Sequence, residues 1–463
     1  MAKAKKKEEL TLEEKLERAL VPVEEQPYQV PENWCWTRIR EICEFERGIT
    51  FPASAKEYEL TEENIACLRT ANIQEELELE DLLYVNKRYT KGNEAKLVKK
   101  DDIIMSSANS RELVGKVSYV YDVNEPMTFG GFVLNIRAKK ILSKYLFYML
   151  RFEFLSGRFM SESTQTTNIA NINTTTLGNY CFPLSPLAEQ QQIVEQIESL
   201  FAKLDEAKEK IQGVIANNKM YKQSILRKAF NGEFTNEWRK MNHISKNTWE
   251  EKTLSSVCKS IFDGDHMPPP KADIGVNFLV ISNINTGYLS FENTRYVTQE
   301  YYDNLTETRK PEKGDVLYTL VGSYGIPVVV DSNHPFCFQR HIGLLKPNTI
   351  DTYYLWYQLQ SQEFFDKATT IANGTAQLTV PIKGLRQLTI KCPTIEEQKE
   401  IVRVLDRTLE KYKQVKESAE FVIQQIDLMK KSILAKAFRG ELGTNNPEEE
   451  SAIELLKEIF EKS

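Results

Sequence analysis

Few side chains in this sequence have the types and spacing that chemistry requires. The run from Asp263 to His266, Asp-Gly-Asp-His, places two carboxylates beside an imidazole, a set that could bind a metal ion or transfer a proton. Its spacing matches no metal-binding signature, and the surrounding Gly and Pro residues are typical of a turn. The remaining histidines have no obvious carboxylate or cysteine partner: His243, His334 and His341. We expect a structural turn at residues 263–266, with an acid/base cluster as the alternative.

The motifs of common enzymes are absent from the sequence. It contains no GxxxxGK[ST] phosphate loop and no GxGxxG after a strand. The three prolines at 268–270 follow Met267, so they do not form the Asn/Asp-Pro-Pro-aromatic arrangement that holds a flipped adenine in amino-methyltransferases. We therefore expect a non-catalytic chain that binds no metal and no cofactor. An enzyme with an unfamiliar motif stays open, with residues 263–266 as its only candidate.

Composition limits the class of protein. The chain has 463 residues, of which 41% are hydrophobic and 27% charged, enough for two to four domains. No apolar run has membrane-spanning length, and the basic N-terminus lacks the apolar region of a signal peptide. Seven cysteines without a CxxC pair favour reduced thiols in the cytoplasm. The net charge of −6 argues against nonspecific coating of nucleic acid.

The elements that must position any site include a stretch that occurs twice. Residues 189–234 and 397–442 align without a gap, with 18 identities over 46 positions. The identities cluster at the ends of the stretch, at Glu-Gln, Ser-Ile-Leu, Lys-Ala-Phe and Gly-Glu. A match of this length indicates an internal duplication.

Both copies have the apolar heptad pattern of a helix seam. In each copy the a and d positions are mostly apolar and the e and g positions mostly charged or amide, which predicts a helix of about 42 residues, roughly 60 Å long. Gly232 and Gly440 follow the last periodic residues, where a helix should stop. The seam residues of the first copy are Ile197, Leu200, Leu204, Ala207, Ile211, Val214, Asn218, Tyr221 and Ile225. Those of the second are Leu405, Thr408, Tyr412, Val415, Ala419, Val422, Ile426, Met429 and Ile433.

A mixed α+β segment precedes each long helix. Short β-branched and aromatic runs read as strands, and the aromatic stretches 141–155 and 350–365 read as helices packed on the sheet. The two segments also echo one another, as at 102–104 and 315–317. We expect an N-terminal lead-in with a short helix at 1–30, a globule at 31–182, a helix at 183–235 and a linker at 236–248. A second globule at 249–392, a second helix at 393–442 and a tail helix at 443–463 complete the chain.

The duplicated helix resembles the two conserved regions of specificity subunits from Type I restriction-modification systems. The shared pattern is EQ…IV…SIL, a variable residue, KAF, a variable residue and GE. The opening of the second globule, IFDGDHMPPPKADIGVNFLVISNINTGYL, resembles the start of target recognition domains in that family. The resemblance covers residues 30–442. The first globule departs from it, because it reads FERGITFPASA where the second has the Asp-Gly-Asp-His turn.

The resemblance implies a DNA reader. Each globule would read one half of a bipartite, asymmetric site in double-stranded DNA, and the helices would pack antiparallel with pseudo-twofold symmetry as a spacer. Two modification subunits, adenine-N6 methyltransferases that carry S-adenosylmethionine, would dock on the helices, and restriction subunits would join them. The alternative is a duplicated scaffold for protein–protein interaction, which would show no salt-dependent binding to DNA.

The charge of the globules complicates a DNA-binding role. Residues 31–182 carry a net charge of about −2 and residues 246–392 about −1, so the basic residues must be segregated onto one face and polar loops must make base contacts. For each candidate, a solvated surface role is the alternative. The candidate DNA contacts are Arg111, Lys116, Thr164, Gln165, Asn168, His266, Lys271, Ser323, Tyr324, Gln339, Arg340, Thr375, Gln377 and Lys383. The candidates for partner docking or helix packing are Ile197, Leu204, Ile211, Ile225, Lys228, Phe230, Leu405, Tyr412, Ile426, Ile433, Lys436 and Phe438.

Overall fold

A computed structural model describes residues 11–165, 169–216, 218–245, 248–266, 269–375 and 377–461. The chain divides into two units, each with one globule and a part of both long helices. Unit 1 comprises Met1–Lys210 and Phe421–Ser463, and unit 2 comprises Ile211–Glu420. Among the described residues, no helix is long and apolar enough to cross a membrane.

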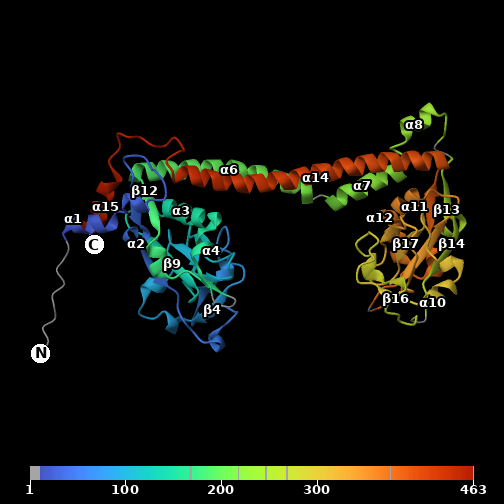
Figure 1. The fold of residues 1–463 in the computed structure, drawn as a ribbon, viewed down its shortest axis with the longest axis horizontal. Helices are drawn as coiled ribbons and strands as arrows, with labels where there is room; N and C mark the ends of the chain where they lie inside the picture. The colour runs from blue at the N-terminus through green and yellow to red at the C-terminus, as the bar shows by residue number, and fades with distance from the viewer. Residues whose placement is uncertain are drawn as a thin grey trace. The chain divides into compact units, whose positions relative to one another are not determined.

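The first globule is built on a four-stranded antiparallel sheet (Figure 1). Its order is β2 (Cys43–Arg47), β9 (Val133–Ala138), β5 (Ile103–Ser106) and β7 (Val117–Tyr119). Successive residues of β5 face opposite sides and all are buried, because each face of the sheet is covered. Ile103 and Met105 pack in one core with helix α3 (Ser143–Ser156). Ile104 packs in another core with the second sheet of this globule, whose order is β4 (Leu83–Asn86), β3 (Asn64–Leu68) and β8 (Met127–Phe129).

The second globule repeats this topology. Its main sheet has the order β14 (Cys258–Asp263), β20 (Ile342–Pro347), β17 (Val316–Thr319) and β18 (Pro327–Val329). Its second sheet has the order β16 (Arg295–Val297), β15 (Val276–Leu279) and β19 (Phe336–Phe338). The helices α11 (Thr352–Leu359) and α12 (Gln362–Thr370) take the place of α3 and α4 (Arg158–Glu162). The predicted α+β globules and their strand-forming runs are therefore confirmed.

Smaller elements complete each globule. One antiparallel pair joins β1 (Cys35–Arg38) to β12 (Cys181–Leu184), and its counterpart joins β13 (Glu250–Thr253) to β21 (Thr389–Cys392). Unit 1 has a further sheet of β10 (Thr164–Gln165), β11 (Ala170–Asn171) and β6 (Ala108–Asn109). The short helices are α2 (Ile39–Ile42), α5 (Thr174–Gly178), α9 (Leu254–Val257), α10 (Gln299–Asp303) and α13 (Ile382–Leu385).

The second duplicated stretch forms one helix, α14 (Ile395–Ala437), as predicted. The first forms α6 (Leu187–Ala216) and α7 (Asn218–Phe230), with residue 217 outside the described residues. The predicted seam is correct at several a positions, since Ile197, Ile225, Leu405 and Ile426 are buried. It is wrong at the d positions in the middle of the helices, which are exposed: Val214 at 50%, Tyr221 at 47%, Val415 at 53%, Val422 at 41% and Met429 at 52%. Two helices alone bury only a narrow stripe of each other.

The Glu-Gln pair at the start of each long helix fastens the helix to its globule. Trp34 Nε1 donates to Glu189 at 2.6 Å, and Trp249 Nε1 donates to Glu397 at 3.0 Å. The amide oxygens of the next residues cap the globule helices: Gln190 accepts from the Leu142 N–H before α3, and Gln398 from the Asp351 N–H before α11, both at 2.9 Å. The four side chains of the two Glu-Gln pairs are buried. Their identity in both copies therefore has a packing explanation.

The C-terminal end of each duplicated stretch packs on the globule that precedes the other duplicated stretch. In unit 1, Phe438 at the end of α14 contacts Tyr145 of α3 with ring centroids 5.3 Å apart. In unit 2, Phe230 at the end of α7 contacts Tyr354 of α11 at 5.6 Å. Gly440, two residues after Phe438, lies against the Pro31 ring, because a Cβ on Gly440 would meet Pro31 Cγ at 2.4 Å. Each globule is thus held by the start of one long helix and the end of the other.

The segments outside the duplication also fold. Helix α1 (Leu12–Ala19) begins with a capping box at Thr11 and packs against the tail helix α15 (Ala452–Glu461). The predicted linker 236–248 contains a helix, α8 (Asn236–Met241), which the sequence analysis missed. Its Arg239 is buried and pairs with Glu397 at 2.5 Å. Arg239 therefore anchors this segment in unit 2, whereas most of its other described residues are exposed.

Candidate nucleic-acid interface

In the second globule the chain crosses itself at Gly264, at the centre of the Asp-Gly-Asp-His run. A Cβ on Gly264 would lie 2.1 Å from the Phe338 carbonyl oxygen, so only glycine fits there. Asp265 accepts from the Tyr301 hydroxyl at 3.0 Å, and His266 lies 3.0 Å from the Asp263 carboxylate. No group of three or more possible metal ligands occurs among the described residues. These contacts are structural, but the predicted turn is wrong, because Asp263 ends strand β14 and Asp265 forms a parallel bridge with Gln339.

Four of the candidate DNA contacts come together at this crossing. They line a hollow of about 330 Å³ between residues 265–266 and 269–271, β15, β16 and the turn 339–341. The four are His266, Lys271, Gln339 and Arg340. Two further side chains on the same wall, Arg295 and Tyr296 of β16, were missed by the sequence analysis. An isolated arginine in a short strand gives no local signal that it faces a hollow.

The other candidates of the second globule gather in the adjoining loops. A Cβ on Gly322 would meet Gln377 Nε2 at 2.8 Å, so the loop 320–326 lies against the loop 373–379. Tyr324 stacks on Phe365 with ring centroids 5.3 Å apart. The side chains of Ser323, Thr375, Gln377 and Lys383 are exposed.

Backbone hydrogen bonds join these loops to the hollow. The Leu320 N–H donates to the His341 carbonyl at 2.9 Å, and the Val380 N–H donates to the Leu320 carbonyl at 2.8 Å. The second globule therefore presents polar side chains and cations from three adjacent loops, the types that contact bases and phosphates.

The first globule brings fewer of its candidates together. Arg111 is exposed in the loop after β6, and Thr164 lies in β10 of the same small sheet. Gln165 ends β10, and Asn168 lies outside the described residues. Lys116 is half-buried and donates to Gln74 Oε1 at 2.8 Å, and burial lowers the pKa of its ammonium group. This lysine is occupied within the fold.

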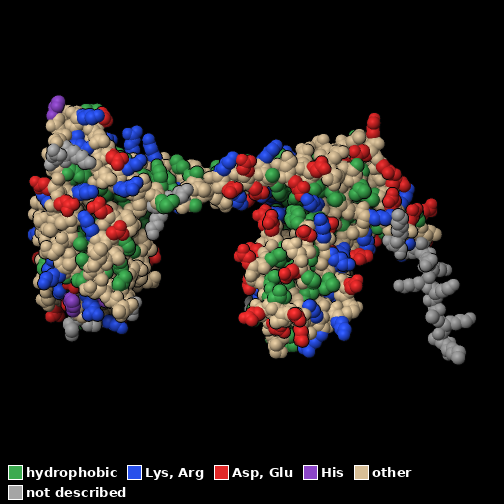
Figure 2. Space-filling view, turned by 180° about the vertical axis from the view of Figure 1, so that it is seen from behind, with side chains coloured by type: hydrophobic (Ala, Val, Ile, Leu, Met, Phe, Trp, Pro, Cys, Tyr) green, Lys and Arg blue, Asp and Glu red, His purple; other side chains and the backbone are tan. Residues whose placement is uncertain are grey.

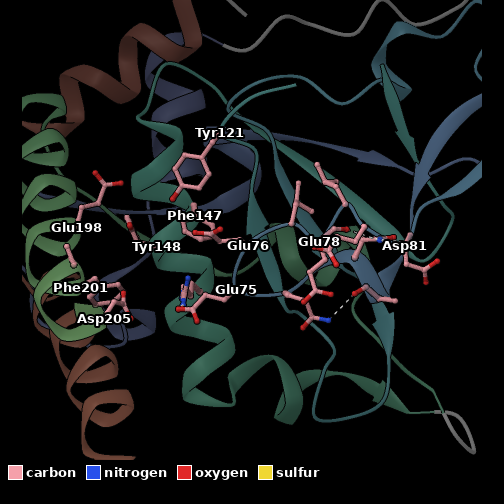
Figure 3. Close-up of a pocket in the computed structure, with 18 residues that line it drawn as sticks. Glu75, Glu76, Glu78, Asp81, Tyr121, Phe147, Tyr148, Glu198, Phe201 and Asp205 are labelled. Atoms are coloured by element: carbon pink, nitrogen blue, oxygen red, sulfur yellow. Dashed lines mark hydrogen bonds and ion pairs between the residues drawn. The ribbon is translucent and has the colours of Figure 1, made fainter. Parts of the chain in front are cut away.

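A large hollow of unit 1 is unsuited to DNA. It measures about 1030 Å³ and lies between the loop 71–81, α3 and α6 (Figure 3). Its floor includes Phe147, Tyr148 and Phe201, and its walls carry Glu75, Glu76, Glu78, Glu80, Asp81, Glu198 and Asp205. Lys430 of α14 ties this hollow together, because its ammonium group pairs with Asp205 and, at 3.5 Å, with Glu75. Seven carboxylates repel a phosphate backbone.

No extended basic face is visible on the side shown in Figure 2, where blue and red side chains are interspersed over both globules. Segregation of cations occurs instead on the scale of single hollows. Among the hollows of unit 2, one at residues 339–341 and another along α14 are lined by cations, the second by Arg403, Arg407 and Lys411, whereas the hollow in Figure 3 is acidic.

The helix candidates divide into buried and exposed sets. Phe230 and Phe438 are buried in the globule cores, together with Ile197, Ile225, Leu405 and Ile426. Leu204, Ile211, Tyr412 and Ile433 are half-buried, and the Tyr412 ring stacks on Tyr221 at 4.4 Å. Lys228 and Lys436 are exposed at equivalent positions. Further apolar side chains are exposed on α14: Phe421 at 59% and Leu428 at 58%.

Comparison with known proteins gives consistent matches. The family model of the type I restriction modification DNA specificity domain matches residues 31–216 and 246–420. The chain is 24% identical over 458 residues to the specificity subunit of the type I restriction enzyme EcoKI from Escherichia coli K12, with 93% of this chain and 96% of that protein covered. It is 25% identical over 450 residues to the StySPI specificity subunit from Salmonella potsdam, with the same coverage.

Two solved structures share the fold. The HsdS subunit from Thermoanaerobacter tengcongensis superimposes with a TM-score of 0.57 at 20% identity, covering 90% of this chain and 100% of that one. A chain from a study of complex assembly and conformational transition of the type I R-M system gives a TM-score of 0.65 at 19% identity, also over 90% and 100%.

Proposed function

Because the chain belongs to the family of type I restriction-modification DNA specificity domains, we propose that it is the sequence-reading subunit of such a system. Each globule reads one half of a bipartite site in double-stranded DNA. The observation that supports this proposal most directly is that the two globules share one sheet topology but differ in their loop sequences. The two globules have the same sheet orders, whereas the residues at their loops differ. Two readers of unequal half-sites require this combination.

The long helices pack antiparallel, related by a pseudo-twofold axis, set the distance between the half-sites and dock two adenine-N6 methyltransferase subunits. Exposed apolar side chains on α14, among them Phe421 and Leu428, support docking, since such side chains on a helix gain free energy when a partner covers them. Lys228 and Lys436 offer equivalent exposed charges beside the buried helix ends. Restriction subunits join this assembly.

The chemistry belongs to the partners in this proposal. The chain itself carries no catalytic residue, and S-adenosylmethionine binds to the methyltransferase subunits. We expect the purified chain alone to neither methylate nor cleave DNA. Isothermal titration calorimetry with S-adenosylmethionine should show no binding, and tight binding by the isolated chain would contradict the proposal.

Deletion of the gene tests the reading function directly. In the host, mapping of methylated adenines should show one bipartite motif that disappears on deletion and returns on complementation. Affinity purification of the tagged chain should recover an adenine methyltransferase. A duplicated protein-interaction scaffold would instead leave every methylated motif in place.

A further inference from the structure

The turn beside the cationic hollow has a counterpart in the first globule. Gln339, Arg340 and His341 correspond to Gly130, Gly131 and Phe132. The Gly264 N–H donates to the Ile342 carbonyl at 3.3 Å, as the Gly48 N–H does to that of Val133 at 3.1 Å. Three more backbone hydrogen bonds occur in both globules. In the second globule, the N–H groups of Gln339, Ile342 and Leu320 donate to the carbonyls of Leu279, Gln339 and His341 in turn. In the first, those of Gly130, Val133 and Ser107 donate to Leu68, Gly130 and Phe132.

The side chains on this shared frame differ in charge. Arg340 is replaced by Gly131. The strand register pairs Phe278 with Arg295 in unit 2, and Cys67 with Leu83 in unit 1. Leu83 is therefore the equivalent of Arg295. Leu83 is buried, whereas Arg295 is exposed. Of the three cations that line the hollow, Lys271 alone has an equivalent. Lys56 precedes the bridge from Glu57 to Tyr84, as Lys271 precedes the bridge from Ala272 to Tyr296.

The three cations of the hollow are available to a ligand. Within the part of the chain that the structure describes, no carboxylate pairs with Lys271, Arg295 or Arg340. Asp265, on the same wall, already has two partners, the Tyr301 hydroxyl and the Arg309 guanidinium at 3.8 Å. The pKa of His341 is lowered by burial and by the neighbouring Arg340.

We propose that the hollow formed by Lys271, Arg295 and Arg340 binds a backbone phosphate of DNA, and that the matching turn of the first globule does not. The proposal rests on the proposed function and names which part of the DNA this site contacts. Three cations from separate segments suit an anionic oxygen, whereas a base edge is read by one or two side chains that match its donors and acceptors. This turn would therefore contribute salt-dependent affinity in the second globule and not in the first.

Loss of a phosphate contact has a signature that loss of a base contact lacks. Each neutralised phosphate steepens the dependence of log affinity on log salt by about 0.9, whatever the sequence. Removing the cations should therefore weaken binding to target and random duplexes alike, and should flatten the salt dependence by about 1. For each tenfold dilution of salt, the variant should therefore gain about tenfold less affinity than the unaltered chain gains.

The experiment compares neutral variants in the full-length chain, purified with the proteins that accompany it. Lys271→Gln, Arg295→Gln and Arg340→Gln are made singly and together, and binding to a random-sequence duplex is titrated over a range of salt concentrations. Lys259→Gln and Lys313→Gln are the matched controls, because both lysines are exposed in the same globule and do not line the hollow. The hollow variants should flatten the slope by about 1, and the controls should leave it unchanged.

A reverse substitution tests whether the equivalent turn of the first globule can acquire a phosphate contact. A Cβ on Gly131 would have its nearest neighbour at 3.5 Å, which is ordinary contact, so Gly131→Arg should fold. We expect it to steepen the salt dependence and to tighten binding to the random duplex. Thermal unfolding of every variant confirms that the fold is kept.

The outcomes separate this inference from the proposed function. Equal slopes for the unaltered chain and the triple variant would overturn the phosphate site and leave DNA reading intact. A changed methylated motif with an unchanged slope would also overturn it, because the side chains would then read a base. If the unaltered assembly does not bind duplex DNA, both the site and the proposed function are wrong.

Discussion

Glu189 and Glu397 occupy equivalent positions and each accepts from a tryptophan, yet their buried carboxylates differ in whether a cation faces them. Glu397 faces the guanidinium group of Arg239, and both side chains are almost fully buried. Within the described residues, Glu189 accepts from neutral donors alone: Trp34 Nε1, the Thr444 hydroxyl and the Asn445 amide. Burial raises the pKa of Glu189, and these three hydrogen bonds offset only part of that effect. The same residue type therefore fulfils two electrostatic roles.

This difference predicts unequal costs for one substitution. Glu397→Gln leaves the Arg239 cation buried without a counter-charge, which should reduce the free energy of unfolding of unit 2 by about 3–5 kcal/mol. Glu189→Gln keeps an oxygen acceptor and leaves no buried charge unpaired, so the free energy of unfolding of unit 1 should fall by only about 1–2 kcal/mol. Calorimetric unfolding of the full chain measures both. Equal losses would show that the Arg239 pair adds nothing beyond its hydrogen bonds.

Individual residues were only partly predictable from the sequence. The duplicated Glu-Gln pairs stood out as identities, but their partners, Trp34 and Trp249, lie about 150 residues away, and only the fold brings them together. Arg239 gave no signal, because nothing in the sequence places a linker residue under a helix start. Lys116 was predicted to face DNA, yet Gln74 holds it within the globule.

The elements were more predictable, because their evidence is local. Strand runs such as 314–320 and the aromatic helices are set by residues that are neighbours in the sequence. The heptad pattern correctly gave the length of α14. It failed for burial of the d positions, since the pattern records apolar residues without stating what covers them. The exposed d positions follow from the narrow stripe that two helices bury of each other.

The ends of the long helices allow packing and docking to be separated. Phe230→Ala and Phe438→Ala should each cost about 3–5 kcal/mol, because the ring fills a globule core. Lys228→Glu with Lys436→Glu should leave the unfolding free energy unchanged within about 0.5 kcal/mol, since both side chains are exposed. The lysine variant should nevertheless weaken binding of the methyltransferase in a pull-down titration. An unchanged affinity in that titration would place the docking surface elsewhere.

At the scale of the whole molecule, the duplication makes recognition modular. Residues 31–182 form the globule of unit 1, fastened to the helices by the buried contacts of Trp34 and Tyr145. Replacing them with another recognition globule that keeps these two side chains should change one half of the methylated motif and preserve the other. Mapping of methylated adenines in the host measures both halves at once. A swap that alters both halves, or neither, would contradict modular reading.

The helices predict how far apart the two halves of the motif lie. The boundaries between the units fall inside the duplicated stretches, after Lys210 and after Glu420, so two helical segments connect them. Four residues inserted beside Ile211 or Ala419 add about one turn, or 6 Å, to a helix. Since base pairs rise by about 3.4 Å, the unread spacer of the motif should lengthen by one or two base pairs, with both half-sites unchanged. Methylome mapping in cells carrying the insertion measures the spacer, and the same insertion with Pro in place of a helix former serves as the control for helical continuity. An active variant that methylates with the original spacer would show that the helices do not set the distance.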